Sequence, residues 1–383
     1  MNSQRWLSLN YFTFFFTWGV FLPYWTGWLI TDKGLSVPAA SIIMGAGMIA
    51  RSLSMLIVFP IATKLYAISV VMRGMAIAAL VTMLFYIPFE SYTALFVITV
   101  LFSAIYPNLM PGMESSASVL IRTEKIHYGK SRSYGSLGYT IALVFVGGVT
   151  ELFGIGSVLW IMIAGLLMMV ASQWIAAPAK LSDKPKRKET NEGVSLKELF
   201  TSGSFGIVLV VSILLQGAHA SYYNYGYIFL DDLGINSFYI GLILNVAVII
   251  EIGFFLKADA LFSEFRPSTL FGLAAIGSTI RWVAIFLFPN VWVFILVQAL
   301  HAVSFGFAHY AFIQYISSKL KASQIPTAQG MYSAFAMSLS VALLTFLGGY
   351  LYEIEPGAAF LGMLICTVPA LILVAVTRQK LKY

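Results

Sequence analysis

Charged residues are rare in the apolar part of this sequence, and five of them lie inside segments long enough to cross a membrane. They are Arg51, Glu114, Arg132, Glu251 and Arg281. A charge at the centre of a bilayer costs about 2.5–3.5 kcal/mol on insertion scales, so such residues usually face a water-filled cavity and serve a pathway. Three cations and two carboxylates therefore predict a site that binds a polar or anionic solute and moves protons. The alternative is a set of structural ion pairs that lock helices together.

Glu114 and Arg132 lie 18 residues apart, on either side of one predicted hairpin whose turn we place near Thr123. Each would then be about nine positions, roughly 13 Å of helix, from the turn. At matching depth on neighbouring helices, the two can form an ion pair or share one ligand. A planar guanidinium gives bidentate hydrogen bonds to a carboxylate. Arg132 is therefore our first candidate to hold an anionic group, and Arg51 is the second.

A group that carries a proton across a membrane has to gain and lose it near working pH. Burial makes a carboxyl group hold its proton more tightly, which favours Glu251 and Glu114 as proton carriers. Histidine, with an ordinary pKa of about 6.5, is the next most suitable group, and His301 lies within an apolar segment.

Polar side chains in the segment 203–230 follow one helix face, at positions i, i+3, i+7 and i+11. They are Gln216, His219, Tyr223 and Tyr227. We interpret this face as the lining of a water-filled path, with hydrogen bonding between helices as the alternative. An aromatic stripe in the first apolar segment includes Trp25 and would suit an aromatic solute. Helix packing and anchoring at the membrane interface are the other uses of such a stripe.

The elements that position these residues are apolar segments. Of the 383 residues, 59% are hydrophobic and 10% are charged, and the mean hydropathy is +0.86, which excludes a soluble domain. A spanning helix needs roughly 20 apolar residues. Twelve segments qualify, at about 8–30, 38–60, 67–88, 93–120, 132–153, 157–177, 203–230, 236–256, 268–288, 291–316, 327–350 and 357–376. The first continues past the length of a cleavable signal, so we expect it to be retained.

The distribution of Lys and Arg predicts the orientation of these segments. If both termini are cytoplasmic, 19 of the 23 basic residues lie on the cytoplasmic side, and only Lys33 lies outside. The net charge of +7 is then a topology signal, and no nucleic-acid partner is expected. We predict a multi-pass protein of the bacterial inner membrane with both termini in the cytoplasm.

A polar stretch divides the chain into two halves. We expect six helices in residues 1–178, a cytoplasmic linker in 179–202 with basic residues at 184–188, and six helices in 203–383. Asp32-Lys33-Gly34-Leu35 is echoed 200 residues later by Asp232-Leu233-Gly234-Ile235, and a charge follows each glycine by 17 residues, Arg51 and Glu251. Internal repeats of this kind are typical of secondary transporters, which bind their solute near mid-membrane at the repeat interface.

Two motifs resemble lactose permease and its relatives. The stretch G-K-S-R-S-Y-G-S-L-G-Y, residues 129–139, resembles the start of that family's fifth helix. The resemblance implies that Glu114 and Arg132 hold the solute and that Tyr139, in place of a tryptophan, stacks on it. The run from Arg281 through His301 to Ile316 resembles the family's ninth and tenth helices, whose arginine and histidine belong to its proton machinery; Arg281 and His301 are 20 residues apart.

A fuller resemblance, over essentially the whole chain, is to the 3-phenylpropionic acid transporter branch of the major facilitator superfamily. It rests on F-L-P-Y-W in the first segment, Ala50-Arg51 in the second, Q-G-A-H-A-S-Y-Y in the seventh, and Arg281-Trp282. Ser304 is a departure, because lactose permease has a carboxylate three residues after its histidine. The loop at 63–74 also lacks the Gly-x-x-x-Asp-Arg pattern common in the superfamily.

The sequence thus predicts an all-α carrier of twelve transmembrane helices in two six-helix bundles. We expect import of a small solute with protons, and the resemblance implies an aromatic carboxylic acid. Import of an oligosaccharide or nucleoside with protons, and export by proton antiport, are the alternatives; an integral-membrane enzyme is the least favoured one. The single cysteine, Cys366, excludes a disulfide or cysteine-based metal site within the chain, and we expect no cofactor. The expected partners are the solute, protons and membrane lipid, with the monomer as the functional unit.

Overall fold

The computed structural model describes residues 3–124, 126–175, 177–182, 196–201, 204–321 and 324–381, and these residues contain helices and no strand. The chain forms two compact units. Unit 1 comprises Met1–Arg187 and Asn236–Leu242, and unit 2 comprises Lys188–Ile235 and Ile243–Tyr383. Within the predicted linker lie two short helices, α8 (Ala179–Ser182) and α9 (Leu196–Thr201). The basic run at 184–188 lies outside the described residues.

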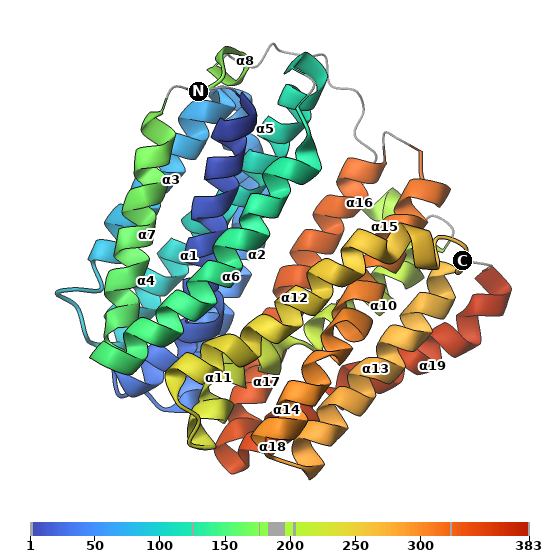
Figure 1. Ribbon diagram of the computed structural model, residues 1–383. Coiled ribbons are helices and arrows are strands. Elements are labelled where there is room, and N and C mark those ends of the chain that lie inside the picture. The colour runs from blue at the N-terminus through green and yellow to red at the C-terminus, as the bar shows by residue number, and fades with distance from the viewer. Residues whose placement is uncertain are drawn as a thin grey trace. The chain divides into compact units, whose positions relative to one another are not determined.

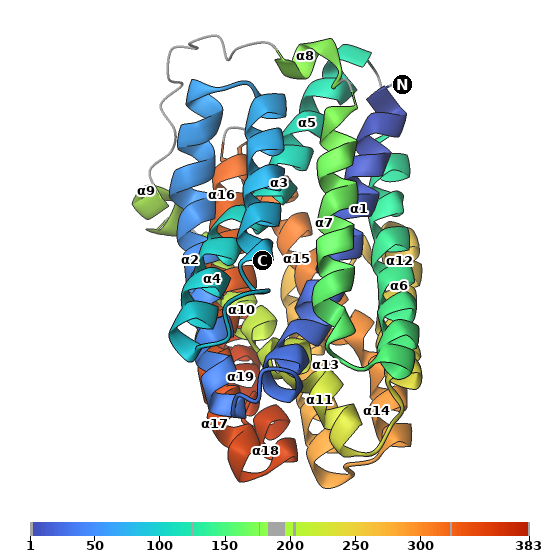
Figure 2. The ribbon, with the colours of Figure 1, turned by 90° about the vertical axis from the view of Figure 1, so that its left-hand side faces the viewer.

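Unit 1 is built mainly from long helices. They are α1 (Ser3–Thr31), α2 (Val37–Leu65), α3 (Ile68–Leu84), α4 (Tyr92–Ile105), a 3₁₀ turn η1 (Tyr106–Asn108), α5 (Leu109–Glu124), α6 (Tyr128–Phe153) and α7 (Ser157–Trp174). Helix α1 packs along α6 and α7, as both ribbon views show (Figures 1 and 2). The close approach of α1 to α6 needs a glycine, because a Cβ atom at Gly138 would collide with the carbonyl oxygen of Phe12.

Unit 2 has more interruptions in its helices, and it includes α12 only from Ile243 onward. Its elements are α10 (Phe205–Gly217), α11 (Ala220–Asp232), α12 (Ser237–Phe262), α13 (Pro267–Leu287), α14 (Val291–Gln298), the π-helix η2 (Ala302–Gly306), α15 (Phe307–Lys319), α16 (Ile325–Met331), the π-helix η3 (Tyr332–Leu339), α17 (Ser340–Ile354), α18 (Pro356–Leu361) and α19 (Leu364–Leu381). π-Helical turns inside α-helices are frequent at functional sites. Here the first of them begins directly after His301.

Ten helical stretches in the described part of the chain are long and apolar enough to cross a membrane. Each of the twelve predicted segments falls on helix. Helix α3, with 17 residues, is shorter than the ten, and α1 is not among them. The all-helical membrane class therefore agrees with the sequence, while the count of twelve spans stays a prediction.

The two halves of the predicted repeat share one turn. Gly34, between α1 and α2, has φ of 67°, and Gly234, between α11 and α12, has φ of 75°. A residue with positive φ just after a helix end commonly closes the last turn, and glycine adopts this conformation without strain. Because the same turn precedes α2 and α12, Arg51 and Glu251 occupy equivalent positions in these two helices.

Candidate functional site

A chain of buried polar contacts in unit 2 joins three of the predicted proton-coupling residues. Arg281, on α13, is fully buried, and its Nη1 atom lies 2.9 Å from Nδ1 of His301. The Nε2 atom of His301 lies 3.2 Å from Oε2 of Glu251, on α12. Nη2 of Arg281 donates to Oε1 of Gln298 at 2.9 Å. His301 therefore bridges a buried cation and a partly exposed carboxylate.

The direction of these hydrogen bonds fixes the tautomer of His301. A guanidinium only donates, so the Nδ1 atom of His301 accepts from Arg281. The ring proton then lies on Nε2, where it donates to Glu251. With a second proton on Nδ1, two hydrogen-bond donors would face each other, this nitrogen and Nη1 of Arg281. Protonation of His301 consequently requires that its contact with Arg281 breaks, whereas Glu251 can accept a proton without that conflict.

Aromatic rings enclose the guanidinium of Arg281. Its central carbon lies 4.4 Å from the ring centroid of Tyr222 and 4.6 Å from that of Trp282, within cation–π range. Gln298 links Arg281 to one of these rings, because it accepts from Arg281 and its amide nitrogen donates to the Tyr222 hydroxyl at 3.2 Å. These contacts hold Arg281 in a single orientation toward His301.

His219 joins the same cluster from the break between α10 and α11. Its Nδ1 atom lies 2.9 Å from the Leu215 carbonyl oxygen, so this nitrogen carries the proton. The Ser304 hydroxyl, 3.1 Å from Nε2 of His219, is then the donor in that contact. Ser304 also lies 3.4 Å from Nη1 of Arg281. The residue that replaces the permease carboxylate thus links His219 to Arg281.

Residues of the polar face predicted in the segment 203–230 take part in two hydrogen-bond networks. Gln216 is buried and donates to the Tyr332 hydroxyl at 2.9 Å, which also lies 2.9 Å from Nδ1 of His309. His219 belongs to the Arg281 cluster, and its ring centroid lies 5.9 Å from that of the partly exposed Tyr223. Gln216 and His219 therefore make the interhelical contacts that were the alternative interpretation. A role of this stripe in binding stays a prediction.

In unit 1, two phenols hold the carboxylate of Glu114. Tyr11 donates to its Oε1 atom at 2.9 Å, and Tyr128 lies 3.1 Å from Oε1 and 2.9 Å from Oε2. The guanidinium of Arg132 stacks instead on Phe15, 4.2 Å from the ring centroid, with the Tyr11 centroid at 5.7 Å. Among the described ion pairs, none joins Glu114 to Arg132. Tyr11 contacts both residues.

The predicted turn between these two residues needs a correction. Helix α5 continues to Glu124 and α6 begins at Tyr128, so the turn follows Thr123 by several residues. Glu114 is ten residues, about 15 Å, from the end of its helix, and Arg132 is four residues, about 6 Å, from the start of its own. The two residues are therefore not equally distant from the turn along the chain, although Tyr11 lies close to both of them. Residues on both sides of this turn contact α1: Glu124 accepts from Ser3, and the Gln4 side chain accepts from the His127 amide at 2.8 Å.

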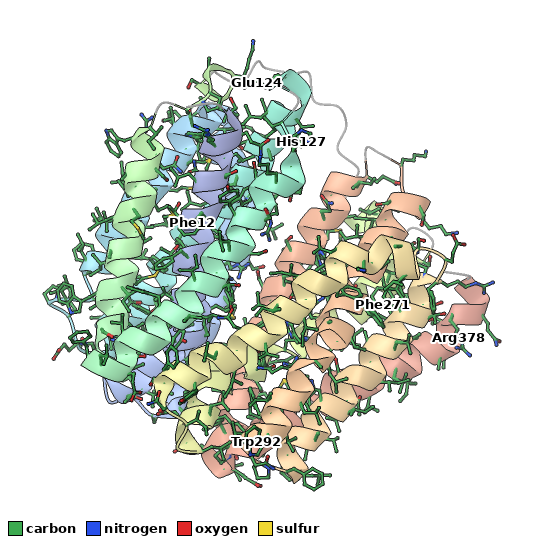
Figure 3. All side chains as sticks on the ribbon, viewed as in Figure 1. Phe12, Glu124, His127, Phe271, Trp292 and Arg378 are labelled. Atoms are coloured by element: carbon green, nitrogen blue, oxygen red, sulfur yellow. The ribbon has the colours of Figure 1, made fainter. Side chains whose placement is uncertain are left out.

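Figure 3 shows Glu124 and His127 at the same end of unit 1 as the start of α1.

The other predicted residues of unit 1 have different surroundings. Arg51 lies over Trp18, with its central carbon 4.9 Å from the ring centroid. Trp25 is fully buried, 4.5 Å from the Trp28 centroid and 5.1 Å from that of Tyr86. Tyr139 is partly exposed and, seven residues after Arg132, lies on the same face of α6.

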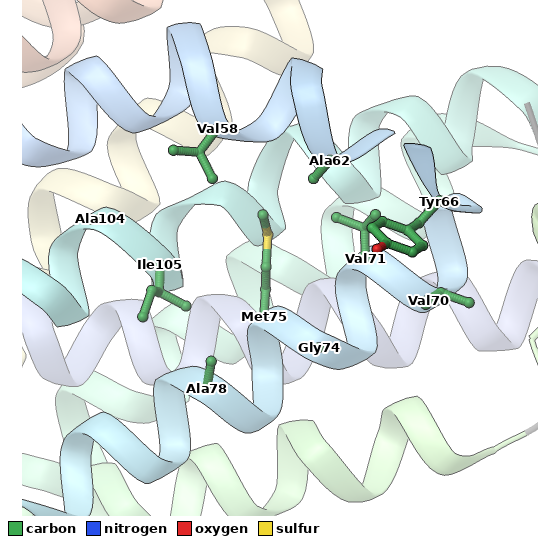
Figure 4. A pocket seen from close by; sticks show the side chains of 10 residues that line it. All are labelled: Val58, Ala62, Tyr66, Val70, Val71, Gly74, Met75, Ala78, Ala104 and Ile105. Atoms are coloured by element: carbon green, nitrogen blue, oxygen red, sulfur yellow. The ribbon is translucent and has the colours of Figure 1, made fainter. Parts of the chain in front are cut away.

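One surface pocket lies elsewhere in unit 1. Figure 4 shows its lining, which is apolar apart from the Tyr66 hydroxyl and comes from α2, α3 and α4. Val58, Tyr66 and Val70 on its rim are exposed, as lipid-facing residues are. None of the predicted site residues lines it. The described residues also contain no group of three potential metal ligands.

Several residues of these networks were not foreseen from the sequence. Gln298, Tyr222 and Tyr128 became recognisable only through their contacts with Arg281 and Glu114. A signal existed for Gln298, because it lies three residues before His301 and so one helical turn away on the same face.

Known proteins resemble this chain over its whole length. A family model described as MFS_1 like family matches residues 4–361. The chain is 28% identical over 376 residues to the "Probable 3-phenylpropionic acid transporter" of Escherichia coli (strain K12), with 97% of each chain covered. It is 26% identical over 380 residues to the maltose permease of Geobacillus stearothermophilus, covering 97% of this chain and 94% of that one. The crystal structure of the nucleoside transporter NupG shares the fold, with a TM-score of 0.82 and 17% identity over 100% of both chains.

Proposed function

Because the chain belongs to the MFS_1 like family of transporters, we propose that this multi-pass membrane protein is a symporter. It imports a small aromatic carboxylic acid together with protons across the bacterial inner membrane. The observation that supports proton coupling is the pair of contacts made by His301, with Arg281 at 2.9 Å and with Glu251 at 3.2 Å. It connects a buried cation to a carboxylate through one neutral imidazole.

The proton is carried by Glu251 in this proposal. The carboxylate is about one-quarter exposed, with 28% of its side chain accessible, whereas Arg281 is fully buried. Protonation of Glu251 removes the negative charge that compensates Arg281 through His301. An uncompensated buried cation is costly, so the cluster has to rearrange when the proton binds or leaves. The change in protonation is thereby coupled to a change in helix contacts in unit 2.

The solute is proposed to contact charged and aromatic residues of unit 1. Arg51 and Arg132 are the intramembrane cations there, and Trp18, Phe15 and Tyr139 supply partly exposed aromatic surface. A relative over nearly the full length is named as a 3-phenylpropionic acid transporter, which agrees with an acid that has an aromatic ring. Protons and this solute are the proposed partners, the monomer is the proposed functional unit, and no cofactor or catalytic step is required.

A sugar or nucleoside is the second candidate solute. The Glu114 carboxylate, with two phenol groups at 2.9 Å, offers the kind of acceptor that binds hydroxyl groups. A maltose permease and a nucleoside transporter are among the similar proteins, which favours the same class of solute. Export by proton antiport uses the same residues in a different order of binding steps.

Purified protein in sealed proteoliposomes tests the proposal. When the pH is lower outside the vesicles than inside, we expect the gradient to drive accumulation of unmodified radiolabelled 3-phenylpropionate above the level of protein-free vesicles. Maltose and uridine are the comparison solutes. Accumulation of either of these in place of 3-phenylpropionate would contradict the aromatic-acid assignment. Chemically altered solute would contradict the assignment as a carrier.

A further inference from the structure

We infer that Arg51, together with Trp18, forms the subsite that binds the carboxylate of the transported acid. The inference rests on the proposed function and deepens it, because it assigns one of the two cations of unit 1 to the anionic group.

The first argument is the position of Arg51 in its helix. Helix α2 runs over Val37–Leu65, so Arg51 is the central residue of the 29. About 21 Å of helix lies on either side of it, which places it near mid-membrane. A charge at this depth is unfavourable unless it meets water, a counter-charge or a ligand.

The second argument is the direction in which Arg51 points. The guanidinium of Arg51 lies over the ring of Trp18, on α1, with its central carbon 4.9 Å from the ring centroid. The Nε atom of Arg51 is buried. Arg51 therefore points toward α1, and the inner part of its guanidinium is covered by protein.

The third argument is charge. Arg281 is compensated by Glu251 through His301, and Arg132 shares the Tyr11 ring with the carboxylate of Glu114. For Arg51, the described part of the chain provides neither a carboxylate within ion-pair distance nor a hydrogen-bond acceptor, and its Nε atom is buried without a partner. The residue as a whole is still partly exposed, so a ligand can reach the rest of the guanidinium. Glu114, which shares Tyr11 with Arg132, would also repel an anion at Arg132.

The internal repeat shows the same difference between a charge that has a hydrogen-bond partner and one that lacks it in the described part of the chain. Arg51 and Glu251 each follow a positive-φ glycine by 17 residues. The charge in unit 2 has a protein partner in His301. Arg51, at the equivalent position of unit 1, contacts the Trp18 ring but has no hydrogen-bond or ion-pair partner among the described residues, and an anionic solute would supply one.

The fourth argument is the surroundings of the guanidinium. Trp18 is partly exposed, and its ring centroid lies 6.0 Å from Phe14, 6.3 Å from Phe21 and 6.0 Å from Tyr106. The Tyr106 hydroxyl is already engaged by Thr17 at 2.6 Å. A cation bordered by rings suits a carboxylate with an apolar ring attached, since the guanidinium fork can bind both oxygens. A neutral sugar would leave the charge of Arg51 uncompensated.

Binding of a matched ligand pair tests the inference. The probes are 3-phenylpropionate and 3-phenylpropanamide, which have almost the same shape but differ in charge. We expect the acid to bind the purified wild-type protein at least tenfold more tightly than the amide, and Arg51→Gln to lose this preference. Arg73→Gln is the control, because Arg73 also lies near a tryptophan, Trp174, yet donates to the Gln173 carbonyl at 3.3 Å. We expect it to keep the wild-type preference.

A second pair of variants covers the case in which Arg51→Gln does not fold. Arg51→Lys keeps the charge but loses the fork, and Trp18→Leu removes the ring beside it; both should weaken binding of the acid more than that of the amide. Retention of the wild-type preference in Arg51→Gln, or in both of these variants, would overturn the inference. So would equal binding of acid and amide to the wild type. The proposed function fails separately, if the wild-type protein selects the acid but shows no proton-driven accumulation.

Discussion

The Nε2 atom of His301 lies 3.2 Å from Oε2 of Glu251, although 50 residues separate them in the sequence. On its other side, His301 accepts a hydrogen bond from the fully buried Arg281. The His301 imidazole thus connects two groups. One is Glu251, the carboxylate that we propose gains and loses the proton, and the other is Arg281, the buried cation that this carboxylate compensates.

The hydrogen bonds predict opposite tautomers for two neighbouring histidines. His301 should carry its proton on Nε2, toward Glu251, and His219 on Nδ1, toward the Leu215 carbonyl. The rings are 5.6 Å apart. Nitrogen NMR of protein labelled with ¹⁵N-histidine can distinguish the two, with His301→Gln and His219→Gln used to assign the signals. A protonated Nδ1 on His301 in the resting protein would contradict the direction of the Arg281 contact.

The phenols around Glu114 predict an unequal loss of stability. A hydrogen bond to a charged group contributes about 1.5–3 kcal/mol. Tyr11 is fully buried, whereas Tyr128 is 38% exposed and water can replace its contact. Tyr11→Phe should therefore lower the free energy of unfolding by more than Tyr128→Phe does. Thermal denaturation in detergent measures the difference, with Tyr134→Phe as an exposed control on the same helix as Tyr128. An equal loss in both variants would mean that burial does not decide the strength of these contacts.

The orientation predicted from the basic residues can be tested directly. Reporter fusions should place Lys186 and Lys382 in the cytoplasm and Asp232 outside. Both lysines lie outside the described residues, so this prediction depends on the sequence alone. An external Lys186 would contradict the orientation predicted from the basic residues.

The sequence was sufficient for the class of fold and the family. Its apolar segments predicted helices, and the resemblance to major facilitator transporters agrees with the family that matches residues 4–361. The paired glycines Gly34 and Gly234 were also a readable signal, because each has the positive φ that closes a helix end. Such features are local, so they can be recognised without knowing which helices touch.

The partners of the charged residues could not be predicted in the same way. Equal spacing from an assumed turn suggested a pair of Glu114 and Arg132, but the turn lies after Glu124, beyond the assumed position. The phenols of Tyr11 and Tyr128 occupy the carboxylate instead. Contacts of this kind depend on how helices pack, and hydrophobic periodicity carries no information about the orientation of polar side chains across an interface.

The central claim is that Glu251 carries the coupled proton, and Glu251→Gln tests it most directly. The amide keeps the size of the side chain and still accepts from His301 Nε2, but it cannot titrate. Two assays on the same proteoliposomes are needed: accumulation of 3-phenylpropionate driven by a pH gradient, and exchange of preloaded solute. Glu264→Gln, which changes an exposed carboxylate two residues beyond α12, is the matched control.

We expect Glu251→Gln to abolish accumulation while exchange persists, because exchange requires no net change in protonation. Glu264→Gln should behave as the wild type in both assays. Loss of both activities would mean that Glu251 acts only as the counter-charge of Arg281, since its removal would leave a buried cation uncompensated. Intact accumulation in Glu251→Gln would contradict the account outright.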